Sequence, residues 1–153
     1  MKRSDKQIAD PAEISHILES NVVCRIAMCD GDTPYLVPVN YGFDGTSIYV
    51  HCAAAGRKLD ILRQNGAVCF EVTDSVSTVS SKSACGFGTR FRSVIGFGTV
   101  SFLTSEKEKR RALQVIMQQH TGRSAWDIPA SRLNSVTLFK IDVDSMTGKK
   151  SGF

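Results

Sequence analysis

The feature that most constrains the fold is a period-two alternation of apolar and polar residues between positions 21 and 52, interrupted only by short turns. In the first segment, NVVCRIAMC (21–29), four apolar side chains fall on one face: Val22, Cys24, Ile26 and Met28. This spacing is typical of a β-strand with one buried face. The turns DGDT and DG join it to PYLVPVNYGF (34–43) and TSIYVHC (46–52). Because such turns connect hairpins, we expect three antiparallel strands.

The rest of the chain predicts three further strands and three helices. The strands are GAVCFEV (66–72), RFRSVIGFGTVSFL (90–103), with a bulge or bend at Gly96 and Gly98, and NSVTLFKIDVD (134–144). The helices are DPAEISHILES (10–20), KLDILRQN (58–65) and a segment capped by Ser105 and Glu108, whose stripe is Leu113, Ile116, Met117 and His120. The serine-rich stretch 73–89 is expected to be a long loop. Strands joined by hairpins, without regular β-α-β alternation, predict a mainly β fold, an antiparallel barrel with flanking helices.

Length and composition limit the classes of function. A chain of 153 residues suits one domain, 1–153, and no stretch approaches the roughly 18 to 20 apolar residues that a membrane span needs. The N-terminus has no apolar signal segment, so we expect a cytoplasmic protein without a membrane partner. A net charge of +4, spread along the chain, argues against nucleic acid as the partner. Five cysteines without a C-x-x-C pair predict neither disulfides nor a metal site, and Cys24 and Cys69 are interpreted as core residues.

The segment HCAAAGRKLDIL (51–62) carries the best candidate for a binding site. A strand that ends near His51 passes through small residues into a helix beginning near Gly56, which places Arg57 and Lys58 in the first helical turn. Cations there oppose the helix dipole, and a bound phosphate would remove the conflict. Free backbone N–H groups, a guanidinium and an ammonium would then converge on the phosphate. The alternative is a pair of solvated surface cations.

Two longer segments resemble a known family. VPVNYGFDGTSIYVHCAAAGRKLDILRQNGAVCFEV (37–72) and RFRSVIGFGTVSFL (90–103) are similar to the pyridoxamine 5′-phosphate oxidase-like split β-barrel flavoproteins, in the nitroimidazole-resistance branch. The similarity covers about residues 5–122 and returns at TGKK (147–150). It implies one FMN-binding split-barrel domain and a homodimer with the flavin at the interface.

The resemblance assigns roles at the phosphate end of the flavin. Arg57 and Lys58 match the pair that binds the FMN phosphate, and Gly56 matches the small residue before them. His51 and Cys52 match the strand end that lies against the cofactor, and the branch also carries histidine at the position of His51.

Other positions match the ring end of the flavin. Pro38, Val39 and Asn40 correspond to the strand along the isoalloxazine, and Ser93 stands where the oxidases carry a glutamine that reaches the other subunit's flavin. The R-x-V-L-L-K segment of the oxidases is absent, and so is their C-terminal tryptophan and arginine pattern. Oxidation of vitamin B6 is therefore not expected.

The resemblance implies an FMN-dependent oxidoreductase that passes electrons to a small-molecule acceptor, such as a 5-nitroimidazole. His51 is the candidate catalytic residue, because imidazole donates a proton near neutral pH; the alternative is that it only packs. A second hypothesis is a flavin- or haem-binding module without turnover, in which His16, His51 or His120 ligates haem. A third, with less support, is a nucleic-acid-binding barrel based on RFRSVIGF and TGKK.

Overall fold

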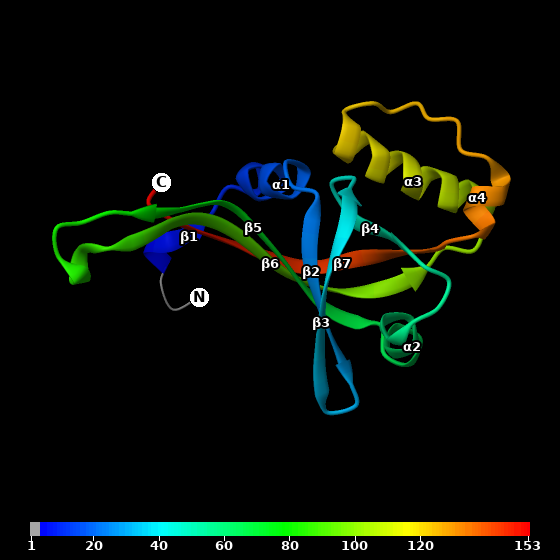
Figure 1. Cartoon of the computed structure of the whole chain (residues 1–153), viewed down its shortest axis with the longest axis horizontal. Helices are drawn as coiled ribbons and strands as arrows, with labels where there is room; N and C mark the ends of the chain where they lie inside the picture. The colour runs from blue at the N-terminus through cyan, green and yellow to red at the C-terminus, as the bar shows by residue number, and fades with distance from the viewer. Residues whose placement is uncertain (1–3) are drawn as a thin grey trace.

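A computed structural model describes residues 4–153, in which seven strands form a barrel with helices on its outside (Figure 1). The strands are β1 (Gln7–Ile8), β2 (Val23–Asp30), β3 (Thr33–Phe43), β4 (Ser47–Cys52), β5 (Ala67–Val79), β6 (Gly88–Phe102) and β7 (Thr137–Ser151). The helices are η1 (Ser4–Lys6), α1 (Pro11–Glu19), α2 (Arg57–Gln64), η2 (Ala84–Gly86), α3 (Glu106–Thr121) and α4 (Ala130–Asn134). No helix of this described part is long and apolar enough to cross a bilayer.

The strands close into a barrel because β7 pairs on both sides. The order is β1-β7-β4-β3-β2-β5-β6, and β6 pairs back onto β7, with every pairing antiparallel. The first part of β7 lies between β4 and β6, whereas its last residues pair with β6 and β1. This arrangement confirms the predicted mainly β fold, a split antiparallel β-barrel with flanking helices.

The alternation seen between residues 21 and 52 places the barrel core where it was predicted. Cys24, Ile26 and Met28 point inward and are buried, as are Tyr41 and Phe43 of β3. Val22 was expected on the same buried face, but it precedes β2 and is largely exposed. The prediction for Cys69 was also wrong in part: the Cys69 side chain lies on the outer face of β5, half-buried, while its neighbours Val68 and Phe70 fill the core.

The predicted loop at 73–89 is instead a β-hairpin arm. Strands β5 and β6 remain paired to Val79 and Gly88, and the arm reaches away from the barrel (Figure 1, left). A bulge interrupts the pairing between Asp74 and Ser77, and Ser75 has φ 57°. Neither face of the outer arm is buried, so no apolar alternation marks it in the sequence. Its threonine and valine residues nevertheless suit strands.

The last strand also differs from its predicted bounds. It begins at Thr137, because residues 130–134 form α4, and it continues to Ser151, so that TGKK (147–150) is part of the sheet. The predicted bulge in β6 is confirmed by a register shift between Phe97 and Gly98. A Cβ on Gly96 would lie only 2.2 Å from the Phe70 ring, so glycine there permits close packing across the core.

Helix α3 packs across β3 and β4, on the outside of the barrel. Its predicted capping box is present: the Ser105 side chain accepts from the backbone N–H of Glu108, and the Glu108 carboxylate accepts from that of Ser105. The close approach depends on Gly42, where a Cβ would lie 2.7 Å from the backbone of Ile116. His120 was expected in the buried stripe, but it is exposed near the end of the helix, with Nε2 3.1 Å from the Tyr41 carbonyl oxygen.

Candidate functional site

The predicted strand-to-helix junction forms as expected between β4 and α2. The chain leaves β4 at Cys52, passes through three alanines (53–55) and Gly56, and begins α2 at Arg57. Gly56, at the helix N-cap, has φ 137° and ψ 159°, a backbone conformation that residues with a side chain rarely adopt. An added Cβ would meet nothing within 4 Å, so glycine is required by the backbone conformation and not by space.

A small cavity opens at the N-terminus of α2. Its volume is about 200 Å³, and it is lined by Tyr35, Val37, Cys52, Ala53, Ala55, Gly56, Arg57, Lys58 and Leu59. No side chain caps the helix, and the Gly56 carbonyl accepts from the backbone N–H groups of Leu59 and Asp60. The N–H groups of Arg57 and Lys58 therefore remain available at the positive end of the helix dipole.

The two adjacent cations have different surroundings. Arg57 donates from Nε (3.1 Å) and Nη2 (3.0 Å) to Asp30 Oδ2 at the end of β2, and its guanidinium lies 4.7 Å from the centre of the Tyr35 ring. Lys58 is half-buried and makes no hydrogen bond or ion pair with any residue in 4–153. Arg57 is thus partly neutralised by the protein, whereas the Lys58 ammonium is not.

His51 and Cys52 point to opposite sides of β4. His51 is solvent-exposed, and its pKa is lowered below 6.5, first by partial desolvation and then by the nearby charges of His120 and Lys58. Cys52 packs against the barrel core beside the α2 cavity. Desolvation raises the pKa of the Cys52 thiol, although Lys58 and Arg63 oppose this, so the thiol is protonated at neutral pH and is a poor nucleophile.

The predicted β3 residues are divided between two faces. Pro38 and Asn40 are exposed on the outer face, and Val39 packs inward against the core. Asn40 and His51 each lie one residue beyond the last paired positions of β3 and β4, Tyr41 and Val50, so they are neighbours at the same level of the sheet.

Ser93 is separated from this group within one chain. It lies on β6, opposite Thr73 of β5 and Lys149 of β7, and is not among the residues that line the α2 cavity. The structure therefore brings together the predicted positions at 51–58 but leaves Ser93 on another part of the barrel.

An apolar patch covers the outer face of four adjacent strands. The pairing registers align one residue from each of β3, β2, β5 and β6 in a row: Leu36, Ala27, Cys69 and Phe97. Leu36 is 57% exposed and Phe97 56%. Ile95 continues the patch along β6, whereas the neighbouring positions of β2 and β5 carry the Arg25–Glu71 ion pair. Strand β6 is paired on both sides, so it is the outer face of this strand, and not an edge, that is exposed.

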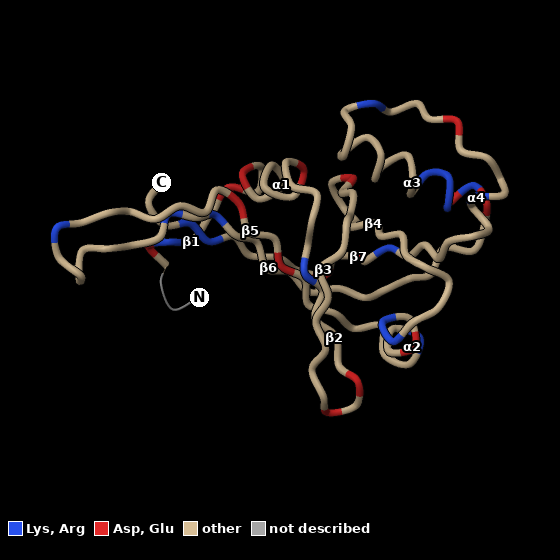
Figure 2. Tube along the Cα trace, in the orientation of Figure 1, with Lys and Arg blue, Asp and Glu red and all other residues tan. Residues whose placement is uncertain are grey.

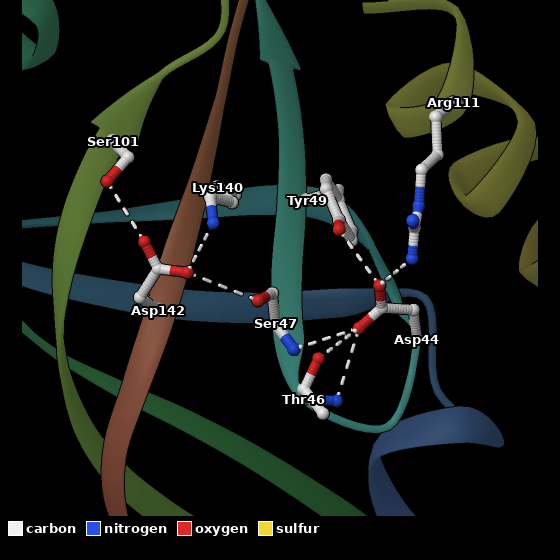
Figure 3. A network of polar contacts seen from close by, with 8 residues as sticks. All are labelled: Asp44, Thr46, Ser47, Tyr49, Ser101, Arg111, Lys140 and Asp142. Carbon is white, nitrogen blue, oxygen red and sulfur yellow. Dashed lines mark hydrogen bonds and ion pairs between the residues drawn. The ribbon is translucent and has the colours of Figure 1, made fainter. Parts of the chain in front are cut away.

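A polar network that the sequence did not predict fastens α3 to the barrel (Figure 3). Asp44 accepts from the Tyr49 hydroxyl (2.8 Å) and from Arg111 of α3 (3.1 Å), and from the backbone N–H groups of Thr46 and Ser47. Burial alone would raise the pKa of Asp44, but the hydrogen bonds from Ser47, Tyr49 and Thr46 outweigh it and lower the pKa to about 2. The only sequence signal was the DG turn.

The second carboxylate of this network is also satisfied. Asp142 of β7 accepts from Ser101 (2.9 Å) and Lys140 (2.6 Å), with a longer contact to Ser47 (3.4 Å). A larger hollow, about 620 Å³, lies against α3, but its lining includes the carboxylates of Glu19 and Asp44 and no lysine or arginine. We place the candidate site at α2, where a cation, free N–H groups and a cavity coincide.

Comparison with known proteins assigns the chain to a family. Residues 10–150 match the model of the family described as pyridoxamine 5′-phosphate oxidase. A segment of 71 residues is 30% identical to an uncharacterized protein of Rhizobium meliloti (strain 1021), and it spans 46% of this chain and 46% of that relative's length.

Solved structures share the fold over nearly the whole chain. A candidate 5-nitroimidazole antibiotic resistance protein of Bacteroides thetaiotaomicron VPI-5482 is 30% identical, with a TM-score of 0.84 over 94% of this chain and 86% of that one. An FAD and haem binding protein of Mycobacterium smegmatis is 20% identical, with a TM-score of 0.86 over 97% of this chain and 74% of that one. The latter likeness concerns the fold alone.

Proposed function

The chain belongs to the pyridoxamine 5′-phosphate oxidase-like family, in its nitroimidazole-resistance branch, and on that premise we propose that it is an FMN-dependent oxidoreductase that reduces nitroaromatic compounds such as 5-nitroimidazoles. The observation that carries the proposal is the α2 N-terminus, where the half-buried Lys58 ammonium has no counter-ion within the described chain. Arg57 and Lys58 line the cavity there, and their backbone N–H groups have no partner within the helix. A phosphate monoester supplies the missing negative charge.

The residues at this end of the barrel fit the phosphate of FMN. Lys58, Arg57 and the first N–H groups of α2 would hold it, and Gly56 leaves the backbone open on that side. FMN supplies hydride and one-electron chemistry when bound, so the protein has only to bind, orient and protect it. The phosphate interaction favours FMN over riboflavin, which lacks that group.

His51 and Asn40 are proposed to face the acceptor. They are neighbours on the outer face of β4 and β3, while Val39 and Cys52 support the same strand ends from inside. The lowered pKa of His51 keeps the imidazole neutral at neutral pH, so that it can donate a hydrogen bond from one ring nitrogen to a small electron acceptor. Proton transfer from His51 would require the protonated imidazole, so it would be faster at lower pH.

We also propose a homodimer with the flavin at its interface. The apolar patch centred on Leu36 and Phe97 is an exposed sheet face of the kind that proteins cover by association. A two-fold arrangement would bury the same patch on both copies and bring Ser93 of one copy toward the flavin of the other.

Nucleic acid and membranes are not proposed as partners, and the cytoplasm stays the predicted location. Figure 2 shows lysine and arginine near the base of the β5–β6 arm, but several of these cations are already paired. Arg92 pairs with Asp74, and Lys150 with Glu13. Such pairing lowers the free positive charge available to phosphate backbones.

Two measurements test the function. The visible spectrum of the purified protein, before and after addition of FMN, separates bound flavin from bound haem and from neither. In the double variant Arg57→Ala/Lys58→Ala, the affinity for FMN should fall at least tenfold more than the affinity for riboflavin, because riboflavin has no phosphate. If the double variant binds both flavins as the parent does, the phosphate assignment is wrong. A haem spectrum would favour the binding-module alternative.

A further inference from the structure

Arg57 already holds an anion that belongs to the protein itself. Asp30 ends β2 and is separated from Thr33, its partner on β3, by the two-residue turn Gly31–Asp32. The tip of this hairpin is acidic (Figure 2). One carboxylate oxygen of Asp30 accepts from both Nε and Nη2 of Arg57, at 3.1 and 3.0 Å.

These two nitrogens form one edge of the guanidinium, the edge that ordinarily binds an oxyanion through two parallel hydrogen bonds. A phosphate oxygen and Asp30 Oδ2 cannot both occupy it. Tyr35 lies over the guanidinium, with its ring centre 4.7 Å away, and restricts the side chain on one side. A flavin phosphate at Arg57 must therefore either displace the carboxylate or bind beside a second negative charge.

Neither partner of the ion pair is deeply buried. The Arg57 side chain is 55% exposed and that of Asp30 41%, so the contact between them is weak enough to exchange. Lys58, by contrast, has no carboxylate to release. The site thus combines one available cation with one that is occupied by the β2–β3 hairpin.

We propose that Asp30 is an internal competitor of the flavin phosphate, so that this carboxylate weakens binding of phosphate-bearing flavins and sets how strongly the site prefers FMN to riboflavin. The inference rests on the proposed function, since it concerns the same site. Binding of FMN exchanges Asp30 for phosphate at Arg57 and frees the β2–β3 hairpin from α2.

The test compares Asp30→Asn with Asp32→Asn, a control that removes the same charge from the same hairpin at an exposed position that makes no ion pair with Arg57. Dissociation constants for FMN and riboflavin are measured by quenching of flavin fluorescence at fixed ionic strength. Asp30→Asn should bind FMN roughly threefold to tenfold more tightly than the parent, with riboflavin unchanged within twofold. Asp32→Asn should change neither constant by more than about twofold.

Each outcome of these measurements either supports or refutes the proposed competition. If the parent prefers FMN to riboflavin but Asp30→Asn binds FMN as well as the parent or less tightly, the competition is refuted and the proposed function stands. Weaker binding of FMN by Asp30→Asn would make Asp30 a positioning residue instead. A parent without that preference refutes the phosphate site and the competition together. If Asp30→Asn does not fold, judged by its thermal transition, Asp30→Ser provides the same comparison. Competition of inorganic phosphate with FMN gives an independent readout, which Asp30→Asn should strengthen.

Discussion

Asp44 should contribute about 2 kcal/mol to the free energy of unfolding at neutral pH. Its side chain is only 12% exposed and accepts hydrogen bonds from Tyr49, Thr46, Ser47 and Arg111. These interactions lower the pKa of Asp44 from 3.8 to about 2. At about 1.4 kcal/mol for each pKa unit, the difference corresponds to about 2 kcal/mol in favour of the folded state.

The sign of the pH dependence follows from the direction of the change. A carboxyl group whose pKa is lower in the folded protein contributes fully above its unfolded pKa, 3.8, because both states are then ionised. As the pH falls from about 4 to about 2, the unfolded chain takes up the proton first. The contribution of Asp44 to stability is therefore lost across that window.

Urea denaturation from pH 7 to pH 2 measures this contribution. Asp44→Asn should be less stable than the parent by about 2 kcal/mol at pH 7, and the gap should narrow between pH 4 and pH 2. Asp32→Asn, on an exposed turn, should stay within about 0.5 kcal/mol of the parent. A gap that does not change with pH, or a carboxyl titration of Asp44 near pH 4 by NMR, would refute the reasoning.

Three further outcomes are expected. Gly96→Ala should destabilise the protein by about 1–3 kcal/mol in urea denaturation, because its Cβ would press on a buried phenylalanine ring of β5, whereas Gly88→Ala, with its nearest neighbour at 4.0 Å, should be nearly neutral. If His51 donates a proton in the rate-limiting step, His51→Gln should slow single-turnover oxidation of the reduced protein by a nitroimidazole roughly 10²-fold. The rate of the parent should then rise as the pH falls below 6.5, because the imidazole becomes protonated. Equal rates for the parent and the variant would remove His51 from the mechanism. Light scattering should give about 33 kDa for the parent, twice the chain mass of 16.7 kDa. Phe97→Lys should give a smaller mass, whereas the control Phe87→Lys, at an exposed position on the arm, should give the mass of the parent. A monomeric parent with flavin bound would contradict the dimer.

Local patterns in the sequence were sufficient to predict the barrel strands and the junction at Arg57. Each of those strands has one buried face, so the core selects apolar residues at every second position, as in Cys24, Ile26 and Met28. The start of α2 could be predicted for a similar reason, since only glycine readily adopts the backbone conformation of Gly56. Predictions of this kind succeed where one residue's own environment decides its type.

The arm at 73–89 and the end of β7 were not predictable in this way. Their strands are held by pairing with each other, and exposed paired strands leave little trace in hydrophobic periodicity. The polar stretch was therefore interpreted as a loop, although its backbone hydrogen bonds are made across the hairpin.

The candidate phosphate site could be identified from the sequence, because Gly56, Arg57 and Lys58 are consecutive and one helix start positions all three. Which other residues meet there depends on the tertiary structure. Asp30 is 27 residues from Arg57 in the chain and reaches it because β2 ends beside α2. The same holds for Asp44 and Arg111, 67 residues apart. Contacts between distant segments depend on how the barrel closes, which no local pattern records.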